Sequence, residues 1–358
     1  MKHIISVLFA LCALSLHAQV FYDAAQMDVF GKAVNGTATH YSRFPQATLD
    51  VARSDLQYLA TDAAGLYVQF GTDSPSVHVR WKSVKKLTMS HMSSVGSRGV
   101  DLYARMRDGG WRFVGSARPA LDYLETTRCI VKDIAPGYHE YRMYLSLYDG
   151  IEKLEIGVDE GFEFKPVEQG VRKAPVVMYG TSILQGGCVS RPGMAATNIL
   201  GRRLDREVVN LGFSGNAILD PEVASLMARV GNPAVFVLDN VPNCTPELIL
   251  EKGEAFVKIL RDAHPSVPIV FVEQAPYSYD SISPESAANV QRKNGAQREI
   301  YNRLKAAGQK NLYYVSGSRL IGTDGEATVD YVHQTDLGQL RYAEVLYPLL
   351  KKLVRKMK

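Results

Sequence analysis

Hydrophobic and polar residues alternate in short runs between Phe21 and about Lys165. A period of two places one set of side chains on a buried sheet face and the other set on the opposite face. Asp-Gly pairs separate several of the runs, at Asp108-Gly-Gly110 and Asp149-Gly150, and such pairs are typical of tight turns between strands. The pattern predicts an antiparallel β-sandwich. The expected strands are residues 65–70, 76–81, 100–106, 111–114, 140–148 and 153–158.

The pattern changes after Ala174, where short apolar runs alternate with longer segments of helical character. Nearly all-apolar strands that are separated by helices are typical of a parallel sheet covered on both faces. Residues 166–173 are expected to link the two parts of the chain. The expected strands are residues 175–179, 207–211, 234–238, 268–272 and 311–315, and the expected helices are residues 193–204, 221–230, 246–263, 286–307 and 336–356.

The first residues fit neither pattern. Lys2 precedes an apolar run from Ile4 to Leu16, and a small residue, Ala18, follows it. This order is typical of a secretory signal peptide. The apolar run is about 13 residues long, which is shorter than the roughly 20 residues that span a bilayer. We therefore expect a signal peptide at 1–18, a β-sandwich domain at 19–168, an α/β domain at 174–358 and a secreted or periplasmic protein, with no membrane-spanning segment.

Composition narrows the function classes only slightly. The chain has 358 residues, with 41 Lys and Arg against 37 Asp and Glu, so its formal charge is +4. This excess is too small for the basic surface of a dedicated nucleic-acid binder, and no nucleic-acid partner is expected. Three cysteines follow the leader, so at most one disulfide can form within the chain. No Cys/His spacing resembles a zinc site; the three cysteines are Cys129, Cys188 and Cys244.

Candidate chemistry lies in the loops after the expected parallel strands, because an open parallel sheet binds ligands outside the carboxyl ends of its strands. Ser182 follows the first strand, where its hydroxyl can project into that crevice. Gly215 follows the second strand beside Asn216, and Asn243 follows the third. Glycine-rich backbone amides and an asparagine side chain can donate to an oxyanion. Each of these features alone also fits an ordinary turn.

A serine nucleophile needs a base, and the base needs a carboxylate that orients it. Only His264 and His333 follow residue 174, and His264 precedes a strand, at the opposite edge of the sheet. His333 is therefore the only candidate base at the carboxyl edge. Asp330, three residues earlier, can reach back to it, whereas Asp324 and Asp336 are less well placed. Taken together, these loops predict a catalytic site.

The order Ser, Asp, His also occurs in α/β-hydrolases. Their nucleophile lies in a Gly-x-Ser-x-Gly turn, and Leu184 stands where the second glycine would be. This departure favours another family.

The four blocks resemble those of the SGNH (GDSL) hydrolase superfamily, over Ala174 to the C-terminus. The resemblance implies a Ser182 nucleophile and a His333 base oriented by Asp330. It implies an oxyanion hole made of the Ser182 and Gly215 amides and the Asn243 side chain. The implied fold is a flavodoxin-like, three-layer α/β/α domain with a five-stranded parallel sheet. The blocks are Gly180-Thr-Ser-Ile, Asn-Leu-Gly-Phe-Ser-Gly215, Asp-Asn-Val-Pro-Asn243 and Asp-Tyr-Val-His333.

Two departures from the usual blocks of the superfamily, and one further motif, indicate a particular subgroup. Thr181 stands where most members have Asp, and Pro242-Asn replaces Gly-x-Asn. Both features resemble a secreted bacterial subgroup whose N-terminal β-domain carries a Gly-x-Asp-Leu-Tyr motif, matched here by Gly99-Val-Asp-Leu-Tyr103. The layout is also similar to carbohydrate esterases with an N-terminal jelly roll.

The expected function is a secreted serine esterase that hydrolyses small acyl esters, acetyl above all, on carbohydrate, with no metal and no organic cofactor. Alternatives are a lipid or thioester acylhydrolase, acyl transfer to a sugar, and a non-catalytic glycan-binding protein with a vestigial site. Aromatic residues of the β-domain could stack on sugar rings, although filling the sandwich core is the favoured interpretation. These residues are Tyr67, Trp81, Tyr103 and Trp111.

Overall fold

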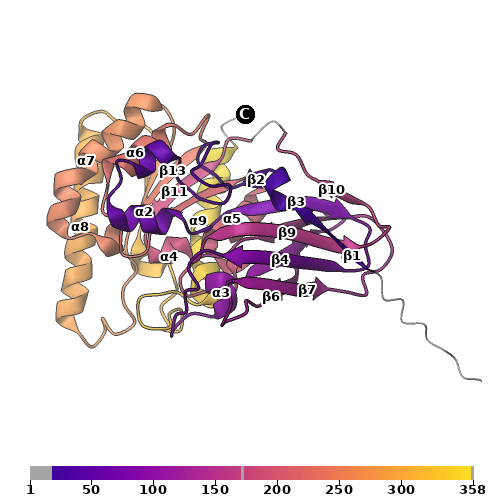
Figure 1. The fold of residues 1–358 in the computed structure, drawn as a ribbon. Helices are drawn as coiled ribbons and strands as arrows, with labels where there is room; N and C mark the ends of the chain where they lie inside the picture. Colours follow the sequence, from indigo (N-terminus) through magenta and orange to yellow (C-terminus); the bar gives the residue numbers. More distant parts are fainter. Residues whose placement is uncertain (1–17, 171–172, 356–358) are drawn as a thin grey trace, which may run out of the picture.

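The computed structural model describes residues 18–170 and 173–355 (Figure 1). All but the last residue of the predicted signal peptide therefore lies outside the described residues. In the described part of the chain, no helix combines the length and the apolar character that crossing a membrane requires.

The N-terminal domain is built on two antiparallel sheets, as the alternating pattern predicts. Val79 and Ile156 of one sheet pack against Val68 and Met143 of the other in a common core. One sheet has the strand order β1-β9-β4-β7, and the other has the order β10-β3-β8-β5-β6, with β2 paired to β3. The strands are β1 (Gln19–Asp23), β2 (Val29–Phe30), β3 (Tyr67–Thr72), β4 (Val77–Ser83), β5 (Val100–Arg105), β6 (Trp111–Ala117), β7 (Glu125–Val131), β8 (His139–Tyr144), β9 (Ile151–Asp159) and β10 (Phe164–Pro166).

Two details differ from the sequence expectation. Strands β1, β2, β7 and β10 were not predicted, and most side chains of β7 are exposed, so no alternation marks it. The predicted turn at Asp149-Gly150 is wrong as a strand-to-strand hairpin, because β8 and β9 lie in different sheets. Asp149 is fully buried and accepts a hydrogen bond from the Lys85 amide (2.7 Å). The segment crosses between the two sheets.

The C-terminal domain is a five-stranded parallel sheet of order β12-β11-β13-β14-β15, the flavodoxin-like order that the family resemblance implies. Alternate strand residues face opposite layers: Tyr179 and Phe236 pack with α6, α7 and α8, and Met178 and Val237 pack with α5 and α9. The elements are β11 (Val176–Gly180), α4 (Ser182–Gln185), α5 (Ala196–Leu204), β12 (Val208–Gly212), α6 (Pro221–Ala228), β13 (Val235–Asp239), α7 (Pro246–Ala263), β14 (Ile269–Val272), α8 (Pro284–Ala306), β15 (Leu312–Val315) and α9 (Asp336–Val354).

Part of the N-terminal half packs on the C-terminal domain. Helices α1 (Gln46–Leu49) and α2 (Ser54–Ala60) precede β3, and α3 (Ser94–Arg98) precedes β5. Helix α1 contacts α6, and the dark helix α2 lies on the side of the C-terminal domain in Figure 1, where its Tyr58 also meets Lys85 just after β4. Phe44 and Leu56 share one core with Phe213 and Val223 of the C-terminal domain. No periodicity in the sequence predicted these helices.

The Gly-x-Asp-Leu-Tyr motif also joins the two domains. Asp101 is fully buried, and its carboxylate accepts hydrogen bonds from Arg191 Nη1 and from the Gly193 amide, both at 2.9 Å. The Tyr103 hydroxyl accepts from the same guanidinium. The four aromatic residues that could have stacked on sugar rings are all buried, which agrees with the interpretation that they fill the core. Their exposed fractions are 1–7 % for Tyr67, Trp81, Tyr103 and Trp111.

Candidate active site

Ser182 stands directly after β11, at the first position of the short helix α4. The Thr181 hydroxyl caps this helix by accepting from the Ile183 amide (3.3 Å). The helix ends at Gly186, whose φ of +114° favours glycine. This tight strand–turn–helix holds the Ser182 side chain at the carboxyl edge of the sheet, where it is 5 % exposed.

The structure brings Ser182, His333 and Asp330 into one hydrogen-bonded chain. Ser182 Oγ lies 3.0 Å from His333 Nε2, and His333 Nδ1 lies 2.7 Å from Asp330 Oδ2. The second carboxylate oxygen of Asp330 accepts from the backbone amides of His333 (2.7 Å) and Val332 (3.1 Å). These bonds favour the tautomer with the proton on Nδ1, which leaves Nε2 free to accept a proton from the serine.

The two other candidate acids, Asp324 and Asp336, and the other histidine, His264, have different partners. Asp324 forms a two-pronged ion pair with Arg341 (2.7 Å for each bond), and Asp336 accepts hydrogen bonds from the Ser190 amide and hydroxyl. His264 lies at the opposite edge, where Nε2 is 2.9 Å from the Ala228 carbonyl oxygen.

The Asp330 carboxylate is held in its ionised form. Partial burial opposes ionisation, but the hydrogen bonds from the His333 side chain and backbone outweigh it, and the pKa of Asp330 is lowered below its usual value. A negative charge at this position stabilises a positively charged His333 imidazolium during proton transfer.

Hydrogen-bond donors follow the two strands that flank β11 in the sheet, β12 and β13. Gly215 has a φ of +70° and is exposed, with open space where a Cβ would be. The Asn243 side chain accepts from the Ala217 amide through Oδ1 (3.1 Å), so its Nδ2 group stays available as a donor. The Ser182 and Gly215 amides and the Asn243 side chain therefore come from three neighbouring strand ends, an arrangement suited to an oxyanion.

Buried polar residues, which the sequence analysis missed, hold the Gly215 loop. Gln185 is fully buried; its Oε1 accepts from the Ser214 amide (2.9 Å), and its Nε2 donates to Asp62 (3.0 Å). Arg43 donates to the Gly212 carbonyl oxygen at 2.6 Å. Burial lowers the pKa of Arg43 to about 10, the Asp62 and Tyr148 charges opposing this. Because Arg43 and Asp62 belong to the N-terminal half, that half supports the loop.

Two cavities lie among the loops at the carboxyl edge of the sheet, and neither is lined by Ser182 or His333 themselves. The smaller one, about 20 Å³, is lined by the residue after Ser182, the residue before Asn243 and the two neighbours of His333, which are Ile183, Pro242, Val332 and Gln334. A cavity of this size holds about one water-sized group.

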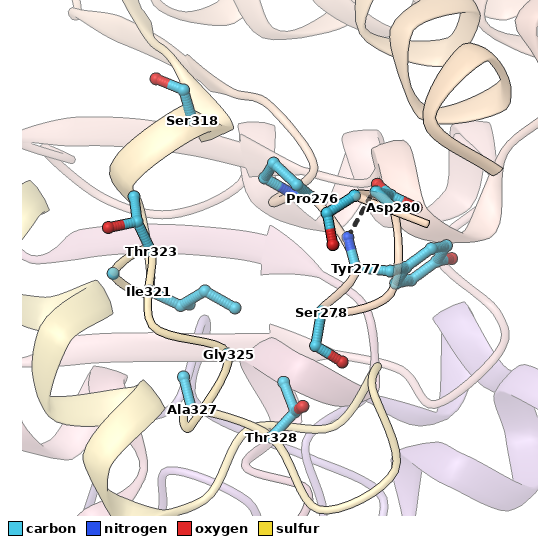
Figure 2. Close-up of a pocket in the computed structure, with 12 residues that line it drawn as sticks. Pro276, Tyr277, Ser278, Asp280, Ser318, Ile321, Thr323, Gly325, Ala327 and Thr328 are labelled. Atoms are coloured by element: carbon cyan, nitrogen blue, oxygen red, sulfur yellow. Dashed lines mark hydrogen bonds between the residues drawn. The ribbon is translucent and has the colours of Figure 1, made fainter. Parts of the chain in front are cut away.

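The larger cavity, about 250 Å³, lies between the loops after β14 and β15 and shares Tyr277 with the smaller one. Figure 2 shows hydroxyl-bearing side chains around it, among them Ser278, Thr323 and Thr328. Three tyrosines cluster at this place: Tyr277 stacks on Tyr279, and both meet the 51 % exposed Tyr331 edge-on.

Comparisons with known proteins identify the family of the chain. The GDSL-like Lipase/Acylhydrolase family profile matches residues 173–351, half of the chain. The chain belongs to this family. A second profile, the N-terminus of SGNH-hydrolase-type esterases that is named for Gly-x-Asp-Leu-Tyr, matches residues 19–164. The SGNH (GDSL) resemblance inferred from the four blocks is confirmed.

Solved structures of similar fold extend over both domains. A GDSL-like protein from Bacteroides ovatus ATCC 8483 is 32% identical, with a TM-score of 0.89, and the match covers 94% of this chain and 98% of that one. The salicylyl-acyltransferase SsfX3 of a tetracycline biosynthetic pathway is 17% identical (TM-score 0.74; 91% and 95% covered). A family two carbohydrate esterase from Cellvibrio japonicus is 14% identical (TM-score 0.61; 96% and 100% covered). No curated protein matches the chain.

Proposed function

We propose that this member of the GDSL-like family is a secreted serine esterase that removes acetyl groups from carbohydrates. The observation that carries the proposal is the continuous chain from Ser182 Oγ through His333 to Asp330, with bonds of 3.0 and 2.7 Å. Membership of the family supports the coarser statement, that the protein hydrolyses esters.

The proposed mechanism uses only side chains and backbone amides. Ser182 Oγ attacks the ester carbonyl carbon while His333 Nε2 takes the hydroxyl proton. The amides of Ser182 and Gly215 and the Asn243 side chain stabilise the resulting oxyanion. The carbon–oxygen bond to the sugar breaks, and His333 gives its proton to the departing alcohol oxygen. Water then attacks the acyl-enzyme by the same route, which releases the acid and restores Ser182.

The small cavity supports acetyl as the acyl group. It lies between Ile183 and Val332, the neighbours of the proposed nucleophile and base, and its volume of about 20 Å³ suits one methyl group. A long acyl chain would need an apolar channel. A lipid or thioester acylhydrolase is thus the less favoured alternative.

Two observations support a carbohydrate as the alcohol. Serine and threonine hydroxyls line the larger cavity, together with Asp280, and such groups suit the hydroxyls of a sugar. The neighbours of similar two-domain fold include family two carbohydrate esterases. The secreted location rests on the predicted signal peptide at 1–18.

The test is acetate release from a panel of acetylated glycans, together with hydrolysis of p-nitrophenyl acetate. Ser182→Ala should abolish both while leaving the fold intact by circular dichroism. Ser266→Ala, an exposed serine at the opposite sheet edge, is the matched control and should keep full activity. Full activity in Ser182→Ala would exclude the proposed nucleophile.

Two further measurements separate the alternatives. A series of p-nitrophenyl esters from acetate to dodecanoate should show a sharp preference for acetate, whereas a lipid hydrolase would improve with chain length. Acyl transfer would appear as an acetylated product when a sugar acceptor is added. Glycan binding without any turnover would indicate a vestigial site.

A further inference from the structure

His333, the proposed base, also belongs to a cluster of side chains that could bind a metal ion. His91, from the segment between β4 and α3, faces His333 with ring centroids 5.4 Å apart. Cys188 completes the group, and the candidate ligand atoms of the three residues all lie within 4.8 Å of one another. Within residues 18–170 and 173–355, this is the one group of three or more His, Cys, Asp or Glu residues with such spacing.

The three side chains are held by separate anchors. Met92, the neighbour of His91, packs in one small apolar core with Cys188 and Val189. The Cys188 amide donates to the Gln334 carbonyl oxygen (2.8 Å), which ties Cys188 to the segment that carries His333. Packing and this hydrogen bond therefore keep an N-terminal imidazole and a buried thiol next to the His333 imidazole.

The bond to Asp330 also suits a metal ligand. Asp330 accepts from His333 Nδ1, so the lone pair of Nε2 faces away from Asp330. Histidines that bind metals are commonly oriented in this way, with the other ring nitrogen bonded to a carboxylate. Two imidazoles and one thiolate make a set that suits a zinc-like ion, whereas Mg²⁺ and Ca²⁺ prefer oxygen ligands.

We propose that Zn²⁺ binds to His91, Cys188 and His333 and reversibly inhibits the esterase. Zinc lies about 2.0–2.3 Å from its nitrogen and sulfur ligands, so small side-chain rotations would close the group around the ion. The Cys188 thiol releases its proton to solvent when it binds, and water or Ser182 Oγ supplies the fourth ligand. A metal on Nε2 occupies the lone pair that would take the serine proton. The inhibitory part rests on the proposed role of His333 as the base.

The activity test titrates Zn²⁺ against p-nitrophenyl acetate hydrolysis, each variant relative to its own zinc-free rate. The wild type should be inhibited, EDTA should restore it, and Mg²⁺ should have no effect. His91→Ala and Cys188→Ser should each raise the zinc concentration for half-inhibition at least about tenfold. Cys129→Ser, which removes an exposed thiol on β7, is the control and should keep wild-type sensitivity. Equal sensitivity in wild type, His91→Ala and Cys188→Ser would overturn the proposal.

A binding test that needs no turnover separates this site from the proposed function. Co²⁺ bound to Ser182→Ala should show a thiolate-to-cobalt charge-transfer band and one-to-one stoichiometry by calorimetry. The band should be lost with the additional change Cys188→Ser, and binding should weaken with His91→Ala. A band that survives Cys188→Ser would refute the site, even if the protein proved to be no esterase. Should Cys188→Ser fail to fold, His91→Ala decides.

Discussion

Asp330→Asn is the sharpest test of the proposed mechanism. Asp330 Oδ1 accepts from two backbone amides, those of Val332 and His333, at 3.1 and 2.7 Å. In the variant the amide oxygen keeps these bonds, so the NH₂ group must point at His333 Nδ1. An NH₂ group can only donate, which forces the ring proton onto Nε2. That nitrogen can then no longer accept the Ser182 proton.

A wrong tautomer of this kind reduces kcat about 10⁴-fold in a serine protease, which corresponds to about 5.4 kcal/mol of transition-state stabilisation. We expect a loss of similar size in kcat for p-nitrophenyl acetate, with little change in KM. The fold should survive, because the backbone bonds remain; circular dichroism and thermal unfolding check this.

The matched control is Asp324→Asn. Asp324 lies six positions earlier and pairs with Arg341 on the surface. This variant should keep kcat within about twofold, because an exposed ion pair contributes little. If Asp330→Asn kept a tenth or more of wild-type kcat, or if Asp324→Asn lost as much as Asp330→Asn, the tautomer argument would be refuted.

Three further predictions concern the oxyanion donor, the acyl cavity and a buried acid. Asn243→Ala should lower kcat about 10²–10³-fold but leave measurable turnover, because it removes one of three donors; an unchanged kcat would contradict the oxyanion role. Val332→Ala widens the small cavity, so the butyrate-to-acetate ratio of kcat/KM should rise. Burial raises the pKa of Asp239 to about 8, against the lowering effect of the Tyr342 hydrogen bond. Unfolded chains lose this proton near pH 3.8. The free energy of unfolding of the wild type should therefore fall by up to about 1.4 kcal/mol for each unit that the pH rises between these two values. Urea unfolding at about pH 5 and 7 should show a flatter pH dependence for Asp239→Asn.

Much of the candidate site follows from local pattern. Each strand of the parallel sheet is a short apolar run, and parallel strands bring their carboxyl ends to one edge. The positions of Ser182, Gly215 and Asn243 at one edge of the sheet therefore follow from the sequence alone. His333 followed by elimination, because His264 precedes a strand.

The local sequence pattern does not decide which aspartate orients His333. Sequence spacing favoured Asp330 over Asp324 and Asp336 but left all three open. In the structure, Asp324 is engaged by Arg341, and Asp336 by Ser190. Partners of this kind come from distant segments, so spacing along the chain does not reveal them.

The sequence by itself determined the two kinds of domain, the strands of the parallel sheet and the residues at their ends, because hydrophobic periodicity is a local property. Only the tertiary structure decided what the N-terminal half contributes: Arg43 and Asp62 behind the Gly215 loop, and His91 beside His333. Asp62 and Gln185, for example, are separated by 123 positions. Such contacts depend on how side chains from separate domains pack, and the size of the small cavity depends on how the loops after β11, β13, β14 and β15 pack together. No periodicity along the chain encodes that packing.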